Sequence, residues 1–314
     1  MTVLPPYLRP GDTIAIVCPA GYMEPSKAQT CIDTLQQWGY RVKIGATLNS
    51  ATLNSVSLNY FSGTDEERLN DLQQVLDDPD IKAILCGRGG YGLTRIIDRI
   101  DFSRFRANPK WIIGYSDITL LHAHIEANFG IATLHAPMAA AFNEGGADGP
   151  DVQFLRLALE GKDLSYSCDP HAFNKSGEIM APLTGGNLAL LAHITGTPSA
   201  PPTAGKILFI EDVGEYLYNI DRMFRQLKRS GHLDRLAGLI AGSFTDGKDT
   251  IRPFGATTEE IIREAIGEYD YPVCFGFPVG HGGHNMALRT GVLHRLSITG
   301  ENVSLYCPGG GTTS

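Results

Sequence analysis

The chain has 314 residues, of which 43% are hydrophobic and 19% are charged, a composition typical of a globular protein that buries a core. A net charge of −8 without any run of Lys and Arg argues against nucleic acid and anionic membrane surfaces as partners. No apolar stretch approaches the roughly 18 residues of a transmembrane helix, and the N-terminus lacks a signal-peptide pattern. The six cysteines form no CxxC pair, which argues against a disulfide framework and a zinc–thiolate site, so we expect a cytoplasmic protein.

The first half of the chain alternates predicted strands and helices. Four short apolar runs predict strands, at 13–17, 41–44, 81–86 and 111–115. Helices are expected between them, at 26–38 with Ser26 as its cap, at 65–76 after a capping box of Thr64 and Glu67, from about residue 93, and at 118–126. Strands separated by helices of this length predict parallel pairing with right-handed crossovers.

The alternating pattern of predicted strands and helices ends near residue 143. The segment 143–150 is rich in turn formers, a short helix is expected near 152–159, and the sequence is then polar to about 177. We therefore expect one domain at 1–150, a linker at 151–177 and a second domain at 178–314. In the latter, the patterns predict strands at 206–211, 236–242, 273–277 and within 288–306, and helices at 220–229 and 258–266.

Ser116 lies where the strand 111–115 gives way to a helix. A serine on such a turn exposes its hydroxyl, as in the nucleophile elbow, although Ile118 stands where that motif has its second glycine. Backbone N–H groups at a helix start are suited to hold an oxyanion. The alternative is that Ser116 simply caps the helix.

The segment Gly87-Arg88-Gly89-Gly90-Tyr91-Gly92 fits G-x-G-x-x-G between a strand and a predicted helix. It follows the third strand instead of the first, and no carboxylate stands at a strand end about 20 residues on, so the dinucleotide signal is weak. The glycines would equally let backbone N–H groups approach a reacting carbonyl. A purely structural turn is the third reading.

Acids and histidines follow two later strands. Glu211 and Asp212 end an apolar strand, where Glu211 could orient an imidazole, or where Asp212 and Glu215 could instead cap the next helix. His281 lies in a glycine-rich loop, with His284 close by and no further ligand near enough in sequence to complete a metal site. Ser116, Glu211 and His281 stand in an order compatible with a catalytic triad, although spacing alone does not bring them together.

From Pro10 to about Gly291 the sequence resembles the LD-carboxypeptidases, a serine peptidase family that includes microcin-immunity peptidases. Five blocks in the same order carry the resemblance: Arg88-Gly89-Gly90-Tyr91-Gly92, Gly114-Tyr115-Ser116-Asp117, Leu183-Thr184-Gly185-Gly186-Asn187-Leu188, Leu208-Phe209-Ile210-Glu211-Asp212 and Gly276-Phe277-Pro278-Val279-Gly280-His281. The resemblance implies an α/β fold, with an N-terminal parallel-sheet domain carrying the nucleophile and a smaller C-terminal α/β domain with a mixed sheet. It also implies a homodimer that needs neither a cofactor nor a metal.

The resemblance further implies roles for individual residues. Ser116 would be the nucleophile, His281 the base and Glu211 the residue that orients it, and the amides of Asp117 and Gly90 would form the oxyanion hole. The expected substrate is a murein tetrapeptide, cut before its terminal D-Ala during cell-wall recycling. Residues expected to contact the substrate and its free carboxylate are Arg88, Gly89 and Arg222.

Three alternatives remain at this point, one of which is a peptide-binding module that has lost activity. The immunity branch of the family hydrolyses peptidyl-nucleotide antibiotics, which calls for an aromatic group to stack on a base. Trp38 and Trp111, the two tryptophans, fall in a predicted helix and strand and offer no obvious platform. The third alternative is a dinucleotide-dependent oxidoreductase that uses the glycine turn at 87–92.

Overall fold

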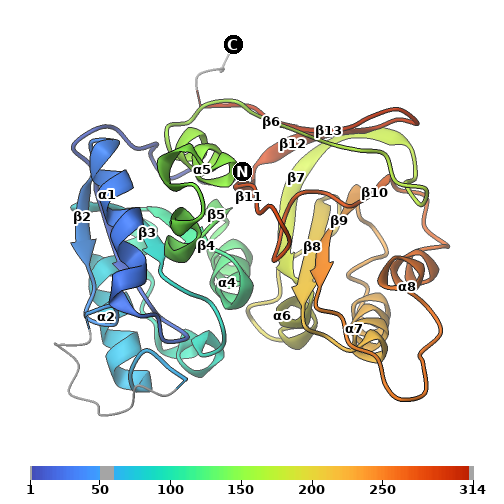
Figure 1. Ribbon diagram of the computed structural model, residues 1–314, viewed down its shortest axis with the longest axis horizontal. Coiled ribbons are helices and arrows are strands. Elements are labelled where there is room, and N and C mark those ends of the chain that lie inside the picture. Colours follow the sequence, from blue (N-terminus) through green and yellow to red (C-terminus); the bar gives the residue numbers. More distant parts are fainter. Residues whose placement is uncertain (1, 50–59, 311–314) are drawn as a thin grey trace.

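The computed structural model describes residues 2–49 and 60–310, which form two sheets lying side by side (Figure 1). The first sheet has the strand order β11-β5-β4-β3-β1-β2. Its strands are β1 (Thr13–Val17), β2 (Arg41–Ile44), β3 (Ile81–Cys86), β4 (Trp111–Gly114), β5 (Thr133–His135) and β11 (Leu288–Thr290). β1 to β5 pair in parallel, and β11 joins antiparallel to β5, so the expected parallel α/β sheet is confirmed.

The second sheet is mixed, as expected, with the order β10-β9-β8-β7-β12-β13-β6. Its strands are β6 (Leu164–Cys168), β7 (Gly177–Asn187), β8 (Ile207–Val213), β9 (Gly238–Thr245), β10 (Val273–Phe275), β12 (Leu293–Ile298) and β13 (Val303–Cys307). β7 to β10 are parallel, whereas β12, β13 and β6 pair antiparallel. β5, β6 and β7 were not among the strands predicted from the sequence.

Eight α-helices connect the strands within the described ranges. They are α1 (Gln29–Gln37), α2 (Asp65–Asp77), α3 (Ser103–Ala107), α4 (Thr119–Phe129), α5 (Pro150–Leu159), α6 (Leu188–His193), α7 (Leu217–Arg229) and α8 (Thr258–Ala265). Short 3₁₀ turns supplement them: η1 (Pro25–Ala28), η2 (Leu93–Arg95), η3 (Ile97–Arg99), η4 (Ser116–Ile118), η5 (Ala139–Asn143) and η6 (Gly146–Asp148). None of the helices in this part of the chain is long and apolar enough to cross a membrane.

Local signals decide some helix starts and not others. The capping box at Thr64 is confirmed, because the Thr64 hydroxyl accepts from the Glu67 N–H while the Glu67 carboxylate accepts from the Thr64 N–H. Ser26 as a cap is wrong, because its hydroxyl donates to the Glu24 carboxylate and residues 25–28 form η1. The helix expected from residue 93 is also wrong, since only the 3₁₀ turns η2 and η3 follow the glycine segment.

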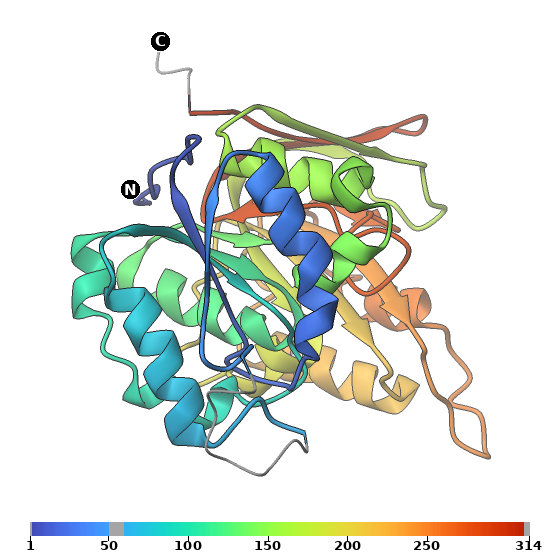
Figure 2. The same cartoon turned by 60° about the vertical axis from the view of Figure 1, so that its left-hand side comes forward.

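The period-two alternation of strand side chains places helices on both faces of the first sheet. Ile14 and Ile16 of β1 share a hydrophobic cluster with α1, whereas Ala15 and Val17 share another with α2. Figure 2 shows α1 and α2 on opposite sides of this sheet. The cluster beneath α1 continues into the second sheet through Leu183, Phe209 and Ile240, which gives the two sheets one contiguous core.

The domain limits of 1–150 and 178–314 stay a prediction, and their outermost residues lie outside the described ranges. The segment expected as a linker holds α5 and β6, and β6 pairs with β13 at the edge of the second sheet. β11 crosses back to the first sheet and pairs with β5. The chain therefore passes between the sheets more than once.

Candidate active site

Ser116 occupies a strained turn directly after β4. Its φ is +64°, a left-handed conformation that costs a non-glycine residue about 1–2 kcal/mol. Gly114 makes the turn possible, because its φ is +158° and a Cβ there would lie 2.9 Å from the Ile118 side chain. Ser116 is not a helix cap, since Tyr115 holds the capping position and no side-chain cap bond forms. The capping alternative is therefore wrong, and the strain places the hydroxyl at the carboxyl edge of the sheet.

The glycine turn after β3 lies directly against this serine. A Cβ on Gly89 would come within 2.8 Å of Ser116 Cβ and 3.0 Å of its Oγ. The turn is fixed by the Gly21 N–H, which donates to the Gly89 carbonyl at 2.9 Å, and Gly90 adopts a φ of +94°. Among the described residues, neither the Gly90 N–H nor the Asp117 N–H has a hydrogen-bond acceptor. Two free amides beside a hydroxyl are suited to an oxyanion.

The Asp117 side chain ties these two turns together. Its Oδ2 accepts from the Leu93 N–H at 2.9 Å, in a fully enclosed position. Burial raises the pKa of Asp117 to about 6, although the Arg68 charge and backbone N–H donors act in the opposite direction. Arg68 is itself buried and donates to the carbonyls of Pro19 and Gly92. The turns that present Ser116 and Gly90 are thus braced by a buried polar network.

Glu211 and His281 form the second half of the site. Glu211 stands near the end of β8 with no solvent exposure, and its Oε2 lies 2.6 Å from His281 Nδ1. Gly280 permits this approach, because a Cβ there would lie 2.6 Å from Glu211 Cβ and 2.8 Å from its Oε2. When the carboxylate is ionised and the imidazole neutral, Nδ1–H donates to Glu211 and Nε2 is left as an acceptor. That tautomer is the one a general base needs.

The two halves meet through Tyr115. Its ring centroid lies 4.8 Å from that of His281, so the base is packed against the residue that precedes Ser116. Burial raises the pKa of Tyr115, and the Glu211 charge adds to that effect. Within the described part of the chain, no hydrogen bond joins Ser116 Oγ to the His281 ring. The structure therefore places the Glu211–His281 pair against the residue that precedes Ser116, and the catalytic triad stays a prediction.

Neighbouring residues hold the histidine loop in place. Asn285 Oδ1 accepts from the Gly280 N–H at 3.0 Å and lies 3.1 Å from His135 Nε2, while Ser243 Oγ accepts from the Gly282 N–H at 2.8 Å. Sequence reasoning missed Asn285 and Ser243. Asn285 lies four residues after His281 and so was within reach of a local search, but Ser243 carries no sequence signal.

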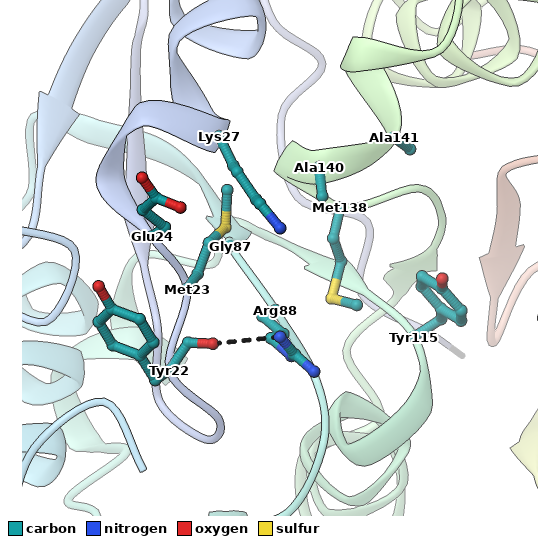
Figure 3. A pocket seen from close by; sticks show the side chains of 10 residues that line it. All are labelled: Tyr22, Met23, Glu24, Lys27, Gly87, Arg88, Tyr115, Met138, Ala140 and Ala141. Atoms are coloured by element: carbon teal, nitrogen blue, oxygen red, sulfur yellow. Dashed lines mark hydrogen bonds between the residues drawn. The ribbon is translucent and has the colours of Figure 1, made fainter. Parts of the chain in front are cut away.

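The other predicted site residues have separate surroundings. Arg88 is exposed and lines a cavity of about 320 Å³, where one guanidinium nitrogen donates to the Tyr22 carbonyl at 3.4 Å (Figure 3). Arg222 contacts its own helix, donating to Asn219 at 3.1 Å and lying over the Tyr218 ring. His284 lies 3.3 Å from an Asp151 oxygen. Across residues 2–49 and 60–310, no cluster of His, Cys, Asp and Glu could hold a metal ion.

The glycine segment 87–92 lacks what a dinucleotide site requires. A pyrophosphate binds at the N-terminus of a helix that follows the glycine turn. Here the turn leads into two three-residue 3₁₀ turns, and Gly89 is packed against Ser116. The oxidoreductase alternative is therefore wrong for this segment.

Comparison with known proteins covers most of the chain. Residues 14–136 match the LD-carboxypeptidase N-terminal domain and residues 180–296 the LD-carboxypeptidase C-terminal domain. A probable murein peptide carboxypeptidase of Bacillus subtilis is 36% identical over 91% of this chain and 89% of its own length. The microcin C7 self-immunity protein MccF of Escherichia coli is 27% identical over 94% and 93%. The crystal structure of muramoyltetrapeptide carboxypeptidase from Oxalobacter formigenes superimposes with a TM-score of 0.83, at 28% identity, over 94% of this chain and 98% of that one.

Proposed function

Since this chain belongs to the LD-carboxypeptidase family, we propose that it releases the terminal D-residue of a murein tetrapeptide through an acyl-enzyme on Ser116. The observation that carries the proposal is the 2.6 Å contact between Glu211 and His281, in a loop packed on Tyr115 beside the strained serine. The names of the Bacillus and Oxalobacter relatives support murein peptides as the substrate class.

The proposed reaction follows from the residues in place. His281 Nε2 takes the hydroxyl proton of Ser116 as Oγ attacks the carbonyl before the terminal residue. Glu211 keeps the imidazole in the required tautomer and stabilises the cation as it forms. The N–H groups of Gly90 and Asp117 bind the oxyanion, each contributing about 3–4 kcal/mol by analogy with other acyl-transfer enzymes. The imidazolium of His281 then gives this proton to the amine of the terminal D-residue, which leaves as the peptide C–N bond breaks. Water, with His281 acting as the base again, releases the shortened peptide from Ser116.

The test is the release of free D-Ala from purified murein tetrapeptide. We expect turnover by the wild type, and a loss of several orders of magnitude in Ser116→Ala and in His281→Ala. Ser103→Ala, an exposed serine at the start of α3, is the matched control and should keep full activity. Turnover by Ser116→Ala at the wild-type rate, with Ser103→Ala equally active, would contradict the proposal.

The similarity to MccF indicates a second candidate substrate class. The same assay should therefore include an aminoacyl sulfamoyl nucleotide. We propose that murein peptides are the better substrates, because the identity to the Bacillus protein is 36% and that to MccF is 27%. Cleavage of the nucleotide with a higher kcat/KM than the tetrapeptide would reverse this assignment.

We also propose a cytoplasmic homodimer. The cytoplasmic site is supported by the six scattered cysteines, whose spacing does not predict a disulfide framework. The dimer is supported by Met180 and Leu293, whose large apolar side chains are 63% and 50% exposed on the adjacent strands β7 and β12. Light scattering on the purified protein would measure its mass in solution and so test the dimer. Leu293→Glu should yield a monomer.

A further inference from the structure

The cavity of about 320 Å³ is adjacent to the reacting serine but separate from the Glu211–His281 pair. Lys27 of η1, Arg88 of the turn after β3, Tyr115 and Met138 all line it. Figure 3 shows the Lys27 ammonium and the Arg88 guanidinium projecting into the same space, opposite Tyr115. Tyr115 precedes Ser116, and Arg88 precedes the glycine that touches the Ser116 side chain. The cavity is therefore lined by the two segments that lie next to Ser116.

Within the part of the chain that the structure describes, neither cation in this cavity has an anionic partner. Among the described residues, Lys27 Nζ makes no ion pair or hydrogen bond, and Arg88 has only the 3.4 Å contact with the Tyr22 carbonyl. Glu24 lines the same cavity, but its carboxylate accepts from the Ser26 hydroxyl and forms no ion pair with Lys27. Two like charges that face one space repel each other, and a bound carboxylate would offset that repulsion. An Arg guanidinium can also bind a carboxylate through two parallel hydrogen bonds.

We propose that Lys27 and Arg88 bind the free carboxylate of the D-residue that the enzyme releases. This inference rests on the proposed function and adds the group that makes the enzyme a carboxypeptidase. One residue spans at most about 3.6 Å, so the terminal carboxylate must lie within about one residue's length of the carbonyl attacked by Ser116. The cavity that holds both cations is lined by segments next to the serine, because Tyr115 precedes Ser116 and Arg88 precedes Gly89, which is packed against it. The contacts of Arg222, in contrast, are all within α7.

The size of the cavity agrees with a small leaving residue. The cavity volume is about 320 Å³. That volume is enough for alanine and its carboxylate, and it lies at the lower end of the range of about 300–1,000 Å³ that small-molecule pockets span. Met138 and the Tyr115 ring supply apolar surface for the methyl group.

The experiment compares four peptides, which end in D-Ala or D-alaninamide and carry diaminopimelate or lysine at the third position. Lys27→Met keeps an unbranched side chain that is one atom shorter and removes its charge. We expect this variant to lose about 10- to 100-fold in kcat/KM on both free acids, as expected for a hydrogen bond to a charged group. On both amides it should stay within about threefold of the wild type. Arg88→Met should act in the same direction, and Lys27→Arg should restore most of the loss.

The matched control is Lys162→Met, an exposed lysine that lines a different cavity. It should leave all four rates unchanged. An equal loss on acids and amides in Lys27→Met would overturn the inference, as would a loss confined to diaminopimelate peptides, which would assign the cations to the third residue. Both results would leave the proposed function intact. A wild type that cleaves none of the four peptides would instead refute the proposed function, and this inference with it.

Discussion

Replacing Glu211 by Gln tests the role of the buried acid most directly. Glu211 has no solvent exposure, and the only hydrogen bond of its carboxylate within the described residues is the one that Oε2 accepts from His281 Nδ1, at 2.6 Å. Within the described ranges His281 forms an ion pair with no other carboxylate, so Glu211 is the anion that would stabilise the imidazolium formed when Ser116 gives up its proton. A glutamine that turns its NH₂ towards Nδ1 would also move the ring proton to Nε2, where the base must accept.

The expected loss follows from the burial of this pair. Removing one partner of a buried charged pair costs about 3–5 kcal/mol, and here the cost falls on the transition state, in which the histidine is charged. At 1.4 kcal/mol per factor of ten, kcat for D-Ala release should fall by roughly 10²- to 10⁴-fold. The free energy of unfolding should rise or stay unchanged. The reason is that a neutral amide replaces a buried carboxylate whose Oε1 has no partner among the described residues.

The assay pairs kcat for D-Ala release with a thermal melt. Glu215→Gln is the matched control, since Glu215 follows the same strand and accepts from Asn219 at 2.8 Å, away from His281. We expect Glu211→Gln to be nearly inactive with an unchanged or higher Tm, and Glu215→Gln to be active. A Glu211→Gln enzyme that keeps more than about a tenth of wild-type kcat would refute the reasoning. An equal loss in Glu215→Gln would refute it as well.

Three further predictions concern the surroundings of the site. Gly89→Ala should abolish activity, because the new Cβ would lie 2.8 Å from Ser116 Cβ. Gly247→Ala is the control and should keep full activity in the same assay, because a Cβ there meets nothing within 4 Å. Burial raises the pKa of Asp117 from 3.8 to about 6, so the folded state binds this proton more tightly than the unfolded state does. The free energy of unfolding of the wild type, relative to Asp117→Asn, should therefore fall by up to about 3 kcal/mol as the pH rises from 4 to 6, and urea titrations showing a flat or rising difference would contradict this. The Cys168 and Cys274 sulfurs lie 3.8 Å apart, so mild oxidation should join them in a disulfide and lower the number of titratable thiols from six to four. Six remaining thiols would show that this disulfide does not form.

Short-range patterns account for the parts of the fold that were predicted well. The apolar run before Ser116 predicts β4, and reciprocal bonding between Thr64 and Glu67 predicts the start of α2. The glycine segment was a weaker guide, because its spacing suggested a following helix where the chain forms η2 and η3. The turn there is set by contacts with distant residues, among them the Gly21 N–H on the Gly89 carbonyl. Local sequence patterns cannot predict a hydrogen bond between residues so far apart in the chain.

The sequence by itself determined the residue types of the site and their positions at strand ends, because period-two alternation and turn chemistry are local properties. Only the tertiary structure decided which of these side chains meet. Glu211 and His281 are 70 residues apart and touch because Gly280 lets the loop approach the end of β8. Lys27 shares a cavity with Arg88 because η1 and the turn after β3 meet at the carboxyl edge of a parallel sheet. Contacts of this kind depend on loop paths and strand register, which hydrophobic periodicity does not encode.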